Sequence, residues 1–340
     1  MPTDPASEPS PHPSLRWGIL GCARITRRGL IPGIAASRTG VLTAIASRDL
    51  ETARAWAGEF SVPRAYGGYT EVLADPEIDA VYIPLPNELH RPWVVAAADA
   101  GKHVLCEKPL ALDADEARSM VENCRSRGVL LMEAFMWRHQ PRTLEIRAKV
   151  AAGAIGELRL IRSSFSFPID AGDWRLDPGR GGGALWDVGC YGVSTARLFA
   201  GSEPDAVKAV AHLGPTGVDL SLSASLRFPG DILASIDCSF EQPFRCVYEL
   251  VGTRGTIEVP DAYLPPAVKP HAIFRTIGSG SDSDALSDRT ERLEFEATDQ
   301  YAAMVDDFAR SIAAGQLVDP AEDGLGQMIV LDRILRSCRG

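Results

Sequence analysis

Several features that define other classes of protein are missing from this sequence. No stretch of apolar residues is long enough to cross a bilayer, so we expect no transmembrane helix. An excess of basic residues is also missing, because the 340 residues carry a formal net charge of -10. Nucleic acids and anionic membranes attract basic surfaces, so neither is expected as the main partner. A local basic site for a phosphate group is compatible with this balance.

The cysteines and histidines do not form the patterns of disulfide-bonded or metal-binding proteins. There are seven cysteines, which is an odd number, and no two of them are spaced as C-x-x-C. A disulfide framework and a zinc site are therefore not expected, and a reducing compartment fits better. His90, His103 and His139 also lack the spacing of metal ligands, so we expect no metal ion.

The N-terminal segment MPTDPASEPSPHPS is rich in proline and contains neither a basic residue nor an apolar core. It does not resemble a signal peptide or a twin-arginine leader, and we expect a disordered tail over residues 1–14. Together with the cysteine pattern, this leads us to expect a cytoplasmic protein.

Between residues 15 and 137, short apolar runs alternate with amphipathic, alanine-rich stretches. The runs are RWGIL, VLTAIAS, DAVYIPLP, HVLCEKP and VLLMEAFM. Continuous apolar strands separated by helices predict a parallel sheet that is covered on both faces. We therefore expect a Rossmann dinucleotide-binding domain over residues 15–137, with its ligand at the carboxyl ends of the strands.

From about residue 156 the pattern changes to longer segments in which polar and apolar residues alternate. They include ELRLIRSSFSF, LSLSASLRF, ILASIDCSF, CVYELVG and GTIEVP, and FPGD between two of them favours a hairpin turn. This alternation predicts a mostly antiparallel sheet with one packed and one open face. We therefore expect an α/β protein whose residues 138–340 form an α+β domain that contributes to the substrate site.

The loop after the first apolar run, LGCARIT, resembles a phosphate-binding loop but lacks the full G-x-G-x-x-G pattern. Gly21 follows the strand directly, where a residue without a side chain turns most easily. Ala23 is the next smallest residue at the point where the backbone would approach a pyrophosphate. A helix that starts near Arg24 would direct its first amides at that phosphate. The alternative is a plain turn between strand and helix, because glycine loops are common.

The end of the second apolar run indicates which dinucleotide would bind. In NAD-binding domains an acidic residue at this point holds the ribose 2′-hydroxyl, whereas the present sequence has Ser47 and Arg48. Arginine can bind a 2′-phosphate through two hydrogen bonds, and serine can donate another. We therefore favour NADP over NAD. The alternative is that Ser-Arg-Asp only caps the next helix.

Six motifs occur in a characteristic order: GILGCARI, IASRD, IPLPNELH, GKHVLCEKPLAL, LMEAFMWRHQP and GGGALWDVGCYGV. From residue 15 to the C-terminus the chain thereby resembles the glucose-fructose oxidoreductase/inositol dehydrogenase (Gfo/Idh/MocA) family. The most similar branches are the NADP-dependent xylose and dihydrodiol dehydrogenases and the sugar-nucleotide 3-ketoreductases. Tyr191 stands where many members carry histidine, which argues against an inositol dehydrogenase. Thr52 replaces a second arginine of some dihydrodiol dehydrogenases, so NADP preference would depend mainly on Arg48.

The resemblance implies a role for each motif residue. It places the pyrophosphate at Gly21, Cys22, Ala23, Arg24 and Ile25, and the 2′-phosphate at Ser47 and Arg48. It also places Leu85, Asn87, His90, Glu107 and Lys108 along the ribose and nicotinamide, and Arg138 and Arg175 over cofactor or substrate. Lys108, Asp187 and Tyr191 would form the catalytic group.

The chemistry of this group leaves two schemes open. A free tyrosine, with a pKa of about 10, is a poor base at neutral pH, but a nearby ammonium such as Lys108 would lower its pKa. Tyr191 would then be the general base for oxidation and the general acid for reduction, with Asp187 orienting the hydroxyl or Lys108. In the second scheme Lys108 donates the proton and Tyr191 only positions the substrate.

We expect an NADP-dependent oxidoreductase that acts on a sugar hydroxyl or carbonyl, and we favour an aldose such as xylose, oxidised at C1. The alternative enzyme is a reductase of a nucleotide-linked keto sugar. Residues 204–300 are poor in lysine and arginine, which favours a free sugar over a diphosphate. A regulator that senses NADP would not need Lys108, Asp187 and Tyr191 together. Family members commonly pair through the second-domain sheet, so the resemblance implies a homodimer or homotetramer.

Overall fold

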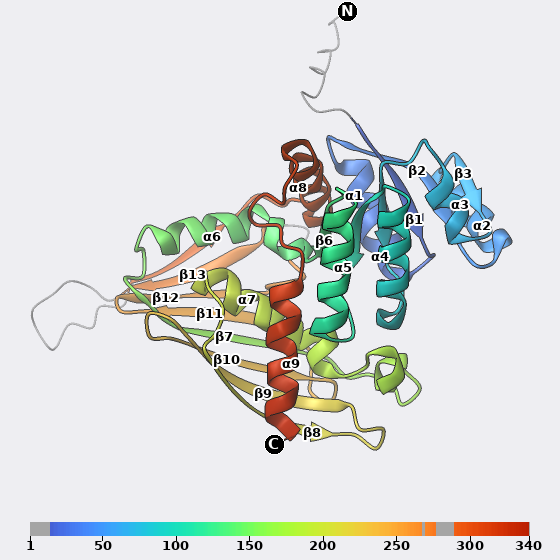
Figure 1. Ribbon diagram of the computed structural model, residues 1–340. Coiled ribbons are helices and arrows are strands. Elements are labelled where there is room, and N and C mark those ends of the chain that lie inside the picture. Colours follow the sequence, from blue (N-terminus) through green and yellow to red (C-terminus); the bar gives the residue numbers. More distant parts are fainter. Residues whose placement is uncertain (1–13, 267–268, 277–288, 340) are drawn as a thin grey trace, which may run out of the picture.

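The computed structural model describes residues 14–266, 269–276 and 289–339, so the expected tail over residues 1–14 lies outside the described residues apart from its last position. Figure 1 shows two sheets with helices packed against them. The first of the two sequence regions distinguished above forms one sheet, and the second region forms the other. The last strand of the first sheet ends at residue 134.

The first sheet has six strands, and every pairing in it is parallel. The strands are β1 (Leu15–Leu20), β2 (Gly40–Ala46), β3 (Arg64–Tyr66), β4 (Ala80–Ile83), β5 (His103–Glu107) and β6 (Leu131–Ala134). Their spatial order is β3-β2-β1-β4-β5-β6, so the direction of the strand order reverses between β1 and β4. Ligands of doubly wound sheets bind at the carboxyl ends of the strands beside this switch point.

Helices connect these strands and cover the sheet. They are α1 (Ile31–Ala36), α2 (Leu50–Phe60), α3 (Tyr69–Ala74), α4 (His90–Asp99) and α5 (Ala114–Ser126). Asp49 and Asp113 begin α2 and α5, because each side chain accepts hydrogen bonds from amides of the first turn. All four residues of β4 are buried, so side chains on both faces of the sheet are covered.

Helix α8 (Gln300–Ala314) comes from the C-terminal part of the chain but packs on the first sheet (Figure 1). Phe308 lies 5.7 Å, between ring centres, from Trp17 on β1. Tyr301 fits against α1 because Gly33 has no side chain, and a Cβ there would approach Tyr301 to 2.4 Å. The core of the Rossmann region therefore includes residues far beyond position 137.

The second sheet has eight strands in the order β14-β13-β12-β11-β7-β10-β9-β8. They are β7 (Leu158–Ser166), β8 (Ala206–Leu213), β9 (Asp219–Phe228), β10 (Ile232–Ser239), β11 (Arg245–Gly252), β12 (Gly255–Pro260), β13 (His271–Thr276) and β14 (Arg289–Glu294). The pairing of β7 with β10 is parallel and the others are antiparallel. The predicted turn at FPGD joins β9 to β10.

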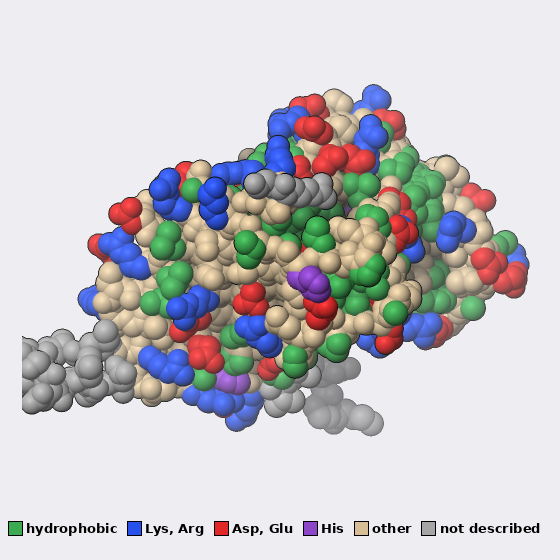
Figure 2. Space-filling model, turned by 90° about the horizontal axis from the view of Figure 1, so that it is seen from below, with side chains coloured by type: hydrophobic (Ala, Val, Ile, Leu, Met, Phe, Trp, Pro, Cys, Tyr) green, Lys and Arg blue, Asp and Glu red, His purple; other side chains and the backbone are tan. Residues whose placement is uncertain are grey.

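One face of this sheet is packed and the other is open, as the alternation predicted. Contacts place α7 (Cys190–Ala200) on β7 and β10, and α9 (Leu325–Arg339) on β8, while α6 (Pro141–Ala151) follows the Rossmann region. Along β9 buried and exposed residues alternate. Seen from below, charged side chains of both signs are interspersed with separate apolar ones (Figure 2). None of the described helices has the length and hydropathy needed to span a membrane.

Candidate active site

Lys108 follows the last residue of β5, so it stands at the carboxyl edge of the first sheet, one strand away from the switch point. Its ammonium donates to the backbone oxygen of Asp187 at 2.7 Å and to Oδ1 of the same residue at 3.1 Å. Both side chains are 13% exposed. An ammonium has three hydrogens, so these two bonds leave one for another acceptor.

Asp187 lies in a wide helical turn, Leu185–Gly189, that leads into α7. Such π-type turns are frequent at functional sites. Its second carboxylate oxygen accepts a 2.7 Å hydrogen bond from Nε of Arg175, whose guanidinium is also paired with Asp173. Burial opposes ionisation, but Lys108 and Arg175 lower the pKa of Asp187. The carboxylate is therefore charged and shared between two cations.

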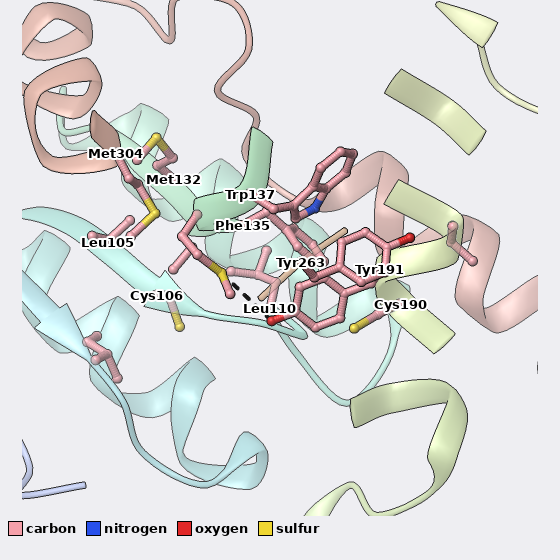
Figure 3. Packing of buried hydrophobic residues seen from close by; sticks show 14 of the residues in the cluster. Leu105, Cys106, Leu110, Met132, Phe135, Trp137, Cys190, Tyr191, Tyr263 and Met304 are labelled. Carbon is pink, nitrogen blue, oxygen red and sulfur yellow. Dashed lines mark hydrogen bonds between the residues drawn. The ribbon is translucent and has the colours of Figure 1, made fainter. Parts of the chain in front are cut away.

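Tyr191 is on the first turn of α7, and the ammonium of Lys108 lies 5.1 Å from the centre of its ring. The structure thus brings the three sequence-predicted catalytic residues together. The ring also contacts Phe135, Phe165 and Tyr263, with centres 4.8 to 5.4 Å apart. Figure 3 shows Tyr191 beside the buried rings of Phe135 and Tyr263.

The expected lowering of the Tyr191 pKa by Lys108 is wrong. The hydroxyl donates to the sulfur of Met136 at 3.8 Å, while Lys108 faces the ring. Burial raises the pKa of Tyr191 well above its ordinary value. The opposite applies to Lys108: burial lowers its pKa, but the charge and hydrogen bond of Asp187, together with the charges of neighbouring groups such as Glu107, outweigh burial and raise it. In this arrangement Tyr191 is a protonated phenol and Lys108 an ammonium ion.

Glu107 is buried at the end of β5, where Tyr82 on β4 donates a hydrogen bond to it. The backbone amide of Lys108 donates to its other oxygen at 3.3 Å. Burial raises the pKa of Glu107. Sequence analysis did not single out Tyr82, because a tyrosine within the apolar run DAVYIPLP looks like an ordinary core residue. The hydrogen bonds that Glu107 accepts from Tyr82 and from the Lys108 amide fix the end of β5, from which the Lys108 side chain extends.

The loop after β1 has the shape of a phosphate loop. Gly21 has φ +125°, and a Cβ there would approach Leu85 to 2.9 Å, so only glycine fits. Cys22 and Ala23 are half-buried, and a helical conformation starts at Arg24 and continues through Ile25 into a π-turn, Thr26–Leu30. Burial raises the pKa of the Cys22 thiol to about 11. The backbone of this loop can approach a pyrophosphate.

Ser47 and Arg48 follow β2 directly, and the next residue, Asp49, is the cap of α2. Asp49 accepts hydrogen bonds from the amides of Glu51 and Thr52 and from the Thr52 hydroxyl. Arg48 is exposed and forms no hydrogen bond or ion pair with the residues that the structure describes. Of the Ser-Arg-Asp segment, Asp49 is thus the residue that caps the next helix. The Arg48 side chain takes no part in the cap and is available to a 2′-phosphate.

The segment after β4 joins the two parts of the molecule. The Asn87 side chain donates to the backbone oxygen of Gly181 at 3.0 Å, and Glu88 forms an ion pair with Arg180. His90 is fully buried, and its ring nitrogens face backbone oxygens of Leu85 and of residues 109 and 110. His90 therefore links the loops after β4 and β5, and its place along the ribose and nicotinamide stays a prediction.

Arg138 is bonded to other parts of the chain, and its expected position over cofactor or substrate stays a prediction. Its guanidinium is buried and donates to the backbone oxygen of Pro320 and to Glu322, both at 2.8 Å, and weakly to Ser194. Glu322 in turn binds Arg197 at 2.8 Å. The C-terminal segment folds back onto Arg138 and holds it in an internal network of ion pairs. No local sequence pattern predicted this contact.

The aromatic residues nearest Tyr191 are phenylalanines and a tyrosine. Trp137 and Trp186 are buried, and the guanidinium groups of Arg175 and Arg180 lie over the half-buried Trp174. Phe165 contacts Tyr191, and its ring centre is 6.4 Å from that of Phe244, which is 54% exposed. Sequence analysis missed Phe244, which immediately precedes β11 and carries no motif.

The three histidines considered as metal ligands each have another partner. His139 pairs with Asp307 at 2.8 Å, and Nδ1 of His103 accepts from the amide of Leu130. Within residues 14–266, 269–276 and 289–339 no group of histidine, cysteine or carboxylate side chains is arranged to hold a metal ion.

Two family models match this chain. Residues 15–135 match an oxidoreductase family with an NAD-binding Rossmann fold, and residues 143–258 match the GFO/IDH/MocA C-terminal domain. The first matched segment contains the six-stranded sheet, and the second contains β7 to β11 and most of β12 of the eight-stranded sheet.

Individual relatives match over nearly the whole chain. D-xylose 1-dehydrogenase (NADP(+)) 2 of Haloferax volcanii is 41% identical over 95% of this chain and 97% of its own length. A dTDP-3,4-didehydro-2,6-dideoxy-alpha-D-glucose 3-reductase of Streptomyces violaceoruber is 39% identical over 89% and 87%. The 3-ketoreductase KijD10 from Actinomadura kijaniata, solved with NADP and TDP-benzene, is 33% identical over 95% and 98%, with a TM-score of 0.86.

Proposed function

This chain belongs to the GFO/IDH/MocA family of oxidoreductases, and on that premise we propose that it transfers a hydride between NADP and a carbon of a sugar. The observation that carries this proposal is the Lys108 ammonium, which Asp187 holds through two hydrogen bonds at the carboxyl edge of the Rossmann sheet. The dinucleotide would lie on the Gly21 loop with its 2′-phosphate at Arg48. When bound, it supplies or accepts the hydride, while the protein orients the substrate and moves the proton.

Lys108 is the proton donor in this proposal. Its third N–H is available to the oxygen of a substrate carbonyl. In reduction the carbonyl carbon gains the hydride and its oxygen gains this proton, leaving a neutral amine; oxidation of the alcohol runs through the same steps in reverse. Tyr191 supports the ammonium with its ring face, since a cation is attracted to an aromatic face.

Asp187 and Arg175 are positioning residues for Lys108. Asp187 fixes the ammonium and keeps it protonated, and Arg175 orients the carboxylate through its other oxygen. Asp173 holds Arg175 from the opposite end. General acid catalysis by a positioned side chain typically contributes about 10²- to 10⁴-fold in rate.

We favour a free aldose, oxidised at C1 to the lactone, as the substrate. Both arginines next to the site are already paired, Arg175 with two aspartates and Arg180 with Glu88. A nucleotide-linked substrate would bring a diphosphate, which calls for cations without a carboxylate partner. The xylose dehydrogenase among the relatives agrees with this choice.

Reduction of a nucleotide-linked keto sugar is the second candidate, and one specific observation favours it. The raised pKa of Lys108 keeps it protonated at neutral pH, so it is available to donate a proton rather than to accept one, which suits reduction. Two of the relatives described above are 3-reductases of this kind. A sensor of NADP without catalysis is the least favoured alternative, because it would not need the assembly of Lys108, Asp187 and Tyr191.

The open face of the eight-stranded sheet would pair two copies of the chain in a homodimer or homotetramer. Val210 on β8 is 72% exposed, and Leu233 on β10 is 51% exposed. Exposed apolar side chains on a long antiparallel sheet suit an interface with a second copy.

The first test of the proposed function is a substrate panel. The protein would be mixed with NADP and free pentoses and hexoses, and in the reverse direction with NADPH and keto sugars with and without a nucleotide. Turnover would be followed by the absorbance of NADPH across a range of pH. Lys108→Met would serve as the catalytic control, with NADPH binding measured to show that the cofactor site is intact.

Rapid oxidation of a free aldose that Lys108→Met abolishes would support the aldose dehydrogenase. Turnover restricted to keto sugars with a nucleotide would establish the second candidate instead. Tight NADPH binding with no turnover of any sugar would contradict both catalytic proposals and leave the sensor.

A further inference from the structure

Three segments of the chain converge at Gly21, and one of them brings a hydroxyl group. A Cβ placed on Gly21 would lie 2.9 Å from Leu85, which follows β4, and 3.8 Å from the Tyr69 hydroxyl. Tyr69 is the first residue of α3, so it reaches this point from the connection between β3 and β4. Its hydroxyl therefore lies beside the glycine turn, at the switch point between β1 and β4.

The Tyr69 side chain is held in place without using its hydroxyl. Its ring packs edge-on against Trp93 of α4, with centres 4.8 Å apart and an interplanar angle of 86°. The residue is 7% exposed. The hydroxyl forms no hydrogen bond with any residue in the described part of the chain. A nearly buried donor with a fixed ring and no protein acceptor is suited to a ligand.

The charges around this hydroxyl favour an anionic acceptor. Burial raises the pKa of Tyr69, and the positive charge of Arg48 only partly opposes this, so the phenol stays protonated and can donate. Arg48, which would hold the 2′-phosphate, thus also lowers the pKa of the Tyr69 hydroxyl through its charge. The neighbouring Cys22 thiol carries no charge at neutral pH, because burial raises its pKa to about 11.

We propose that Tyr69 is a cofactor-binding residue whose hydroxyl donates a hydrogen bond to the pyrophosphate of the dinucleotide where it passes Gly21. This inference rests on the proposed NADP-dependent function and adds a residue to its site. A hydrogen bond to a charged phosphate oxygen is stronger than one between neutral groups. The pyrophosphate is common to NADP and NAD, so Tyr69 contributes affinity for both, whereas Arg48 discriminates between them.

The test is Tyr69→Phe, which removes the hydroxyl and keeps the ring on Trp93. Dissociation constants of NADP and NAD would be measured by calorimetry for the wild type and the variant. We expect both to rise by the same factor, about tenfold, which corresponds to one hydrogen bond to a charged group. Adenosine 2′-monophosphate, which lacks the pyrophosphate, should bind both proteins equally.

Tyr66→Phe is the matched control. Tyr66 ends β3 three residues earlier, but its hydroxyl donates to Asp75 at 2.9 Å, so it has a protein partner. We expect this control to leave both dissociation constants unchanged. Thermal melting of both variants without ligand would establish that they are folded.

Two results would overturn the proposal while leaving the proposed function intact. Unchanged affinities in Tyr69→Phe would mean that the hydroxyl contacts no cofactor atom. Weakened binding of NADP and adenosine 2′-monophosphate, with NAD unaffected, would assign the hydroxyl to the 2′-phosphate. Failure of the wild type to bind either dinucleotide would instead overturn the proposed function, and this proposal with it.

Discussion

The ammonium of Lys108 lies over the ring of Tyr191, 5.1 Å from its centre, while the Tyr191 hydroxyl donates to the sulfur of Met136. The face of the Tyr191 ring stabilises the ammonium that lies over it. An ammonium in this position does little to stabilise a phenolate oxygen at the edge of the ring. In the proposed function this arrangement divides the roles that sequence analysis left open: Lys108 would carry the mobile proton, and Tyr191 would be part of the surface that holds it.

Asp187→Asn should shift the pH dependence of the reaction. Asp187 raises the pKa of Lys108, so loss of its charge lowers that pKa and the ammonium is lost at a lower pH. In the reducing direction, which needs the ammonium, the fall of kcat at high pH should therefore begin at lower pH. The measurement is kcat for NADPH oxidation against pH. Asp173→Asn is the control, because Asp173 contacts Arg175 but not Lys108; an equal shift there would contradict the assignment.

Tyr191→Phe should leave the shape of the pH profile unchanged. Burial keeps the hydroxyl protonated, so no titration of Tyr191 is expected in the working range, and phenylalanine retains the ring beneath Lys108. We expect kcat to fall by less than the roughly 10²-fold or greater loss expected for Lys108→Met. Disappearance of one limb of the profile in Tyr191→Phe would show that this hydroxyl titrates during the reaction.

Arg48→Ala should convert a preference for NADP into weak discrimination. The exposed arginine forms no hydrogen bond or ion pair with the described residues, and a charge-assisted pair of hydrogen bonds to the 2′-phosphate would account for about 10- to 100-fold in affinity. The dissociation constant for NADP should rise by that factor, and that for NAD should stay the same. An equal loss for both dinucleotides would place Arg48 at another part of the cofactor.

Arg138→Met should destabilise the protein without changing its affinity for NADP. It would leave Glu322 with one cation fewer in a buried site, and breaking a buried pair costs roughly 3–5 kcal/mol. Urea unfolding would measure the loss. Arg147→Met is the control, since Arg147 forms an exposed pair with Asp319 that should contribute no more than about 1 kcal/mol. Weakened NADP binding by the folded Arg138 variant would support the sequence-based role.

Local patterns were sufficient for the fold and for the positions of several candidate site residues. Continuous apolar runs separated by helices require a covered parallel sheet, and alternating segments require a sheet with one open face; both are present. Gly21, Arg48 and Lys108 could be recognised because each lies within two residues of the end of a strand, and the ends of parallel strands meet at one edge. Such residues are defined by short-range geometry, which the sequence itself encodes.

Only the tertiary structure decided what the polar groups contact. His90 bonds to loop carbonyls, and Arg138 bonds to Glu322, 184 residues away in sequence. Tyr82 and Tyr69 look like core residues in the sequence, yet each hydroxyl lies at the carboxyl edge of the sheet. The direction of the Tyr191 pKa shift also depended on burial of the side chain, which only the packing of the whole chain decides. A pKa shift or a hydrogen bond depends on differences of a few ångströms between distant segments, and packing of the whole chain fixes those distances.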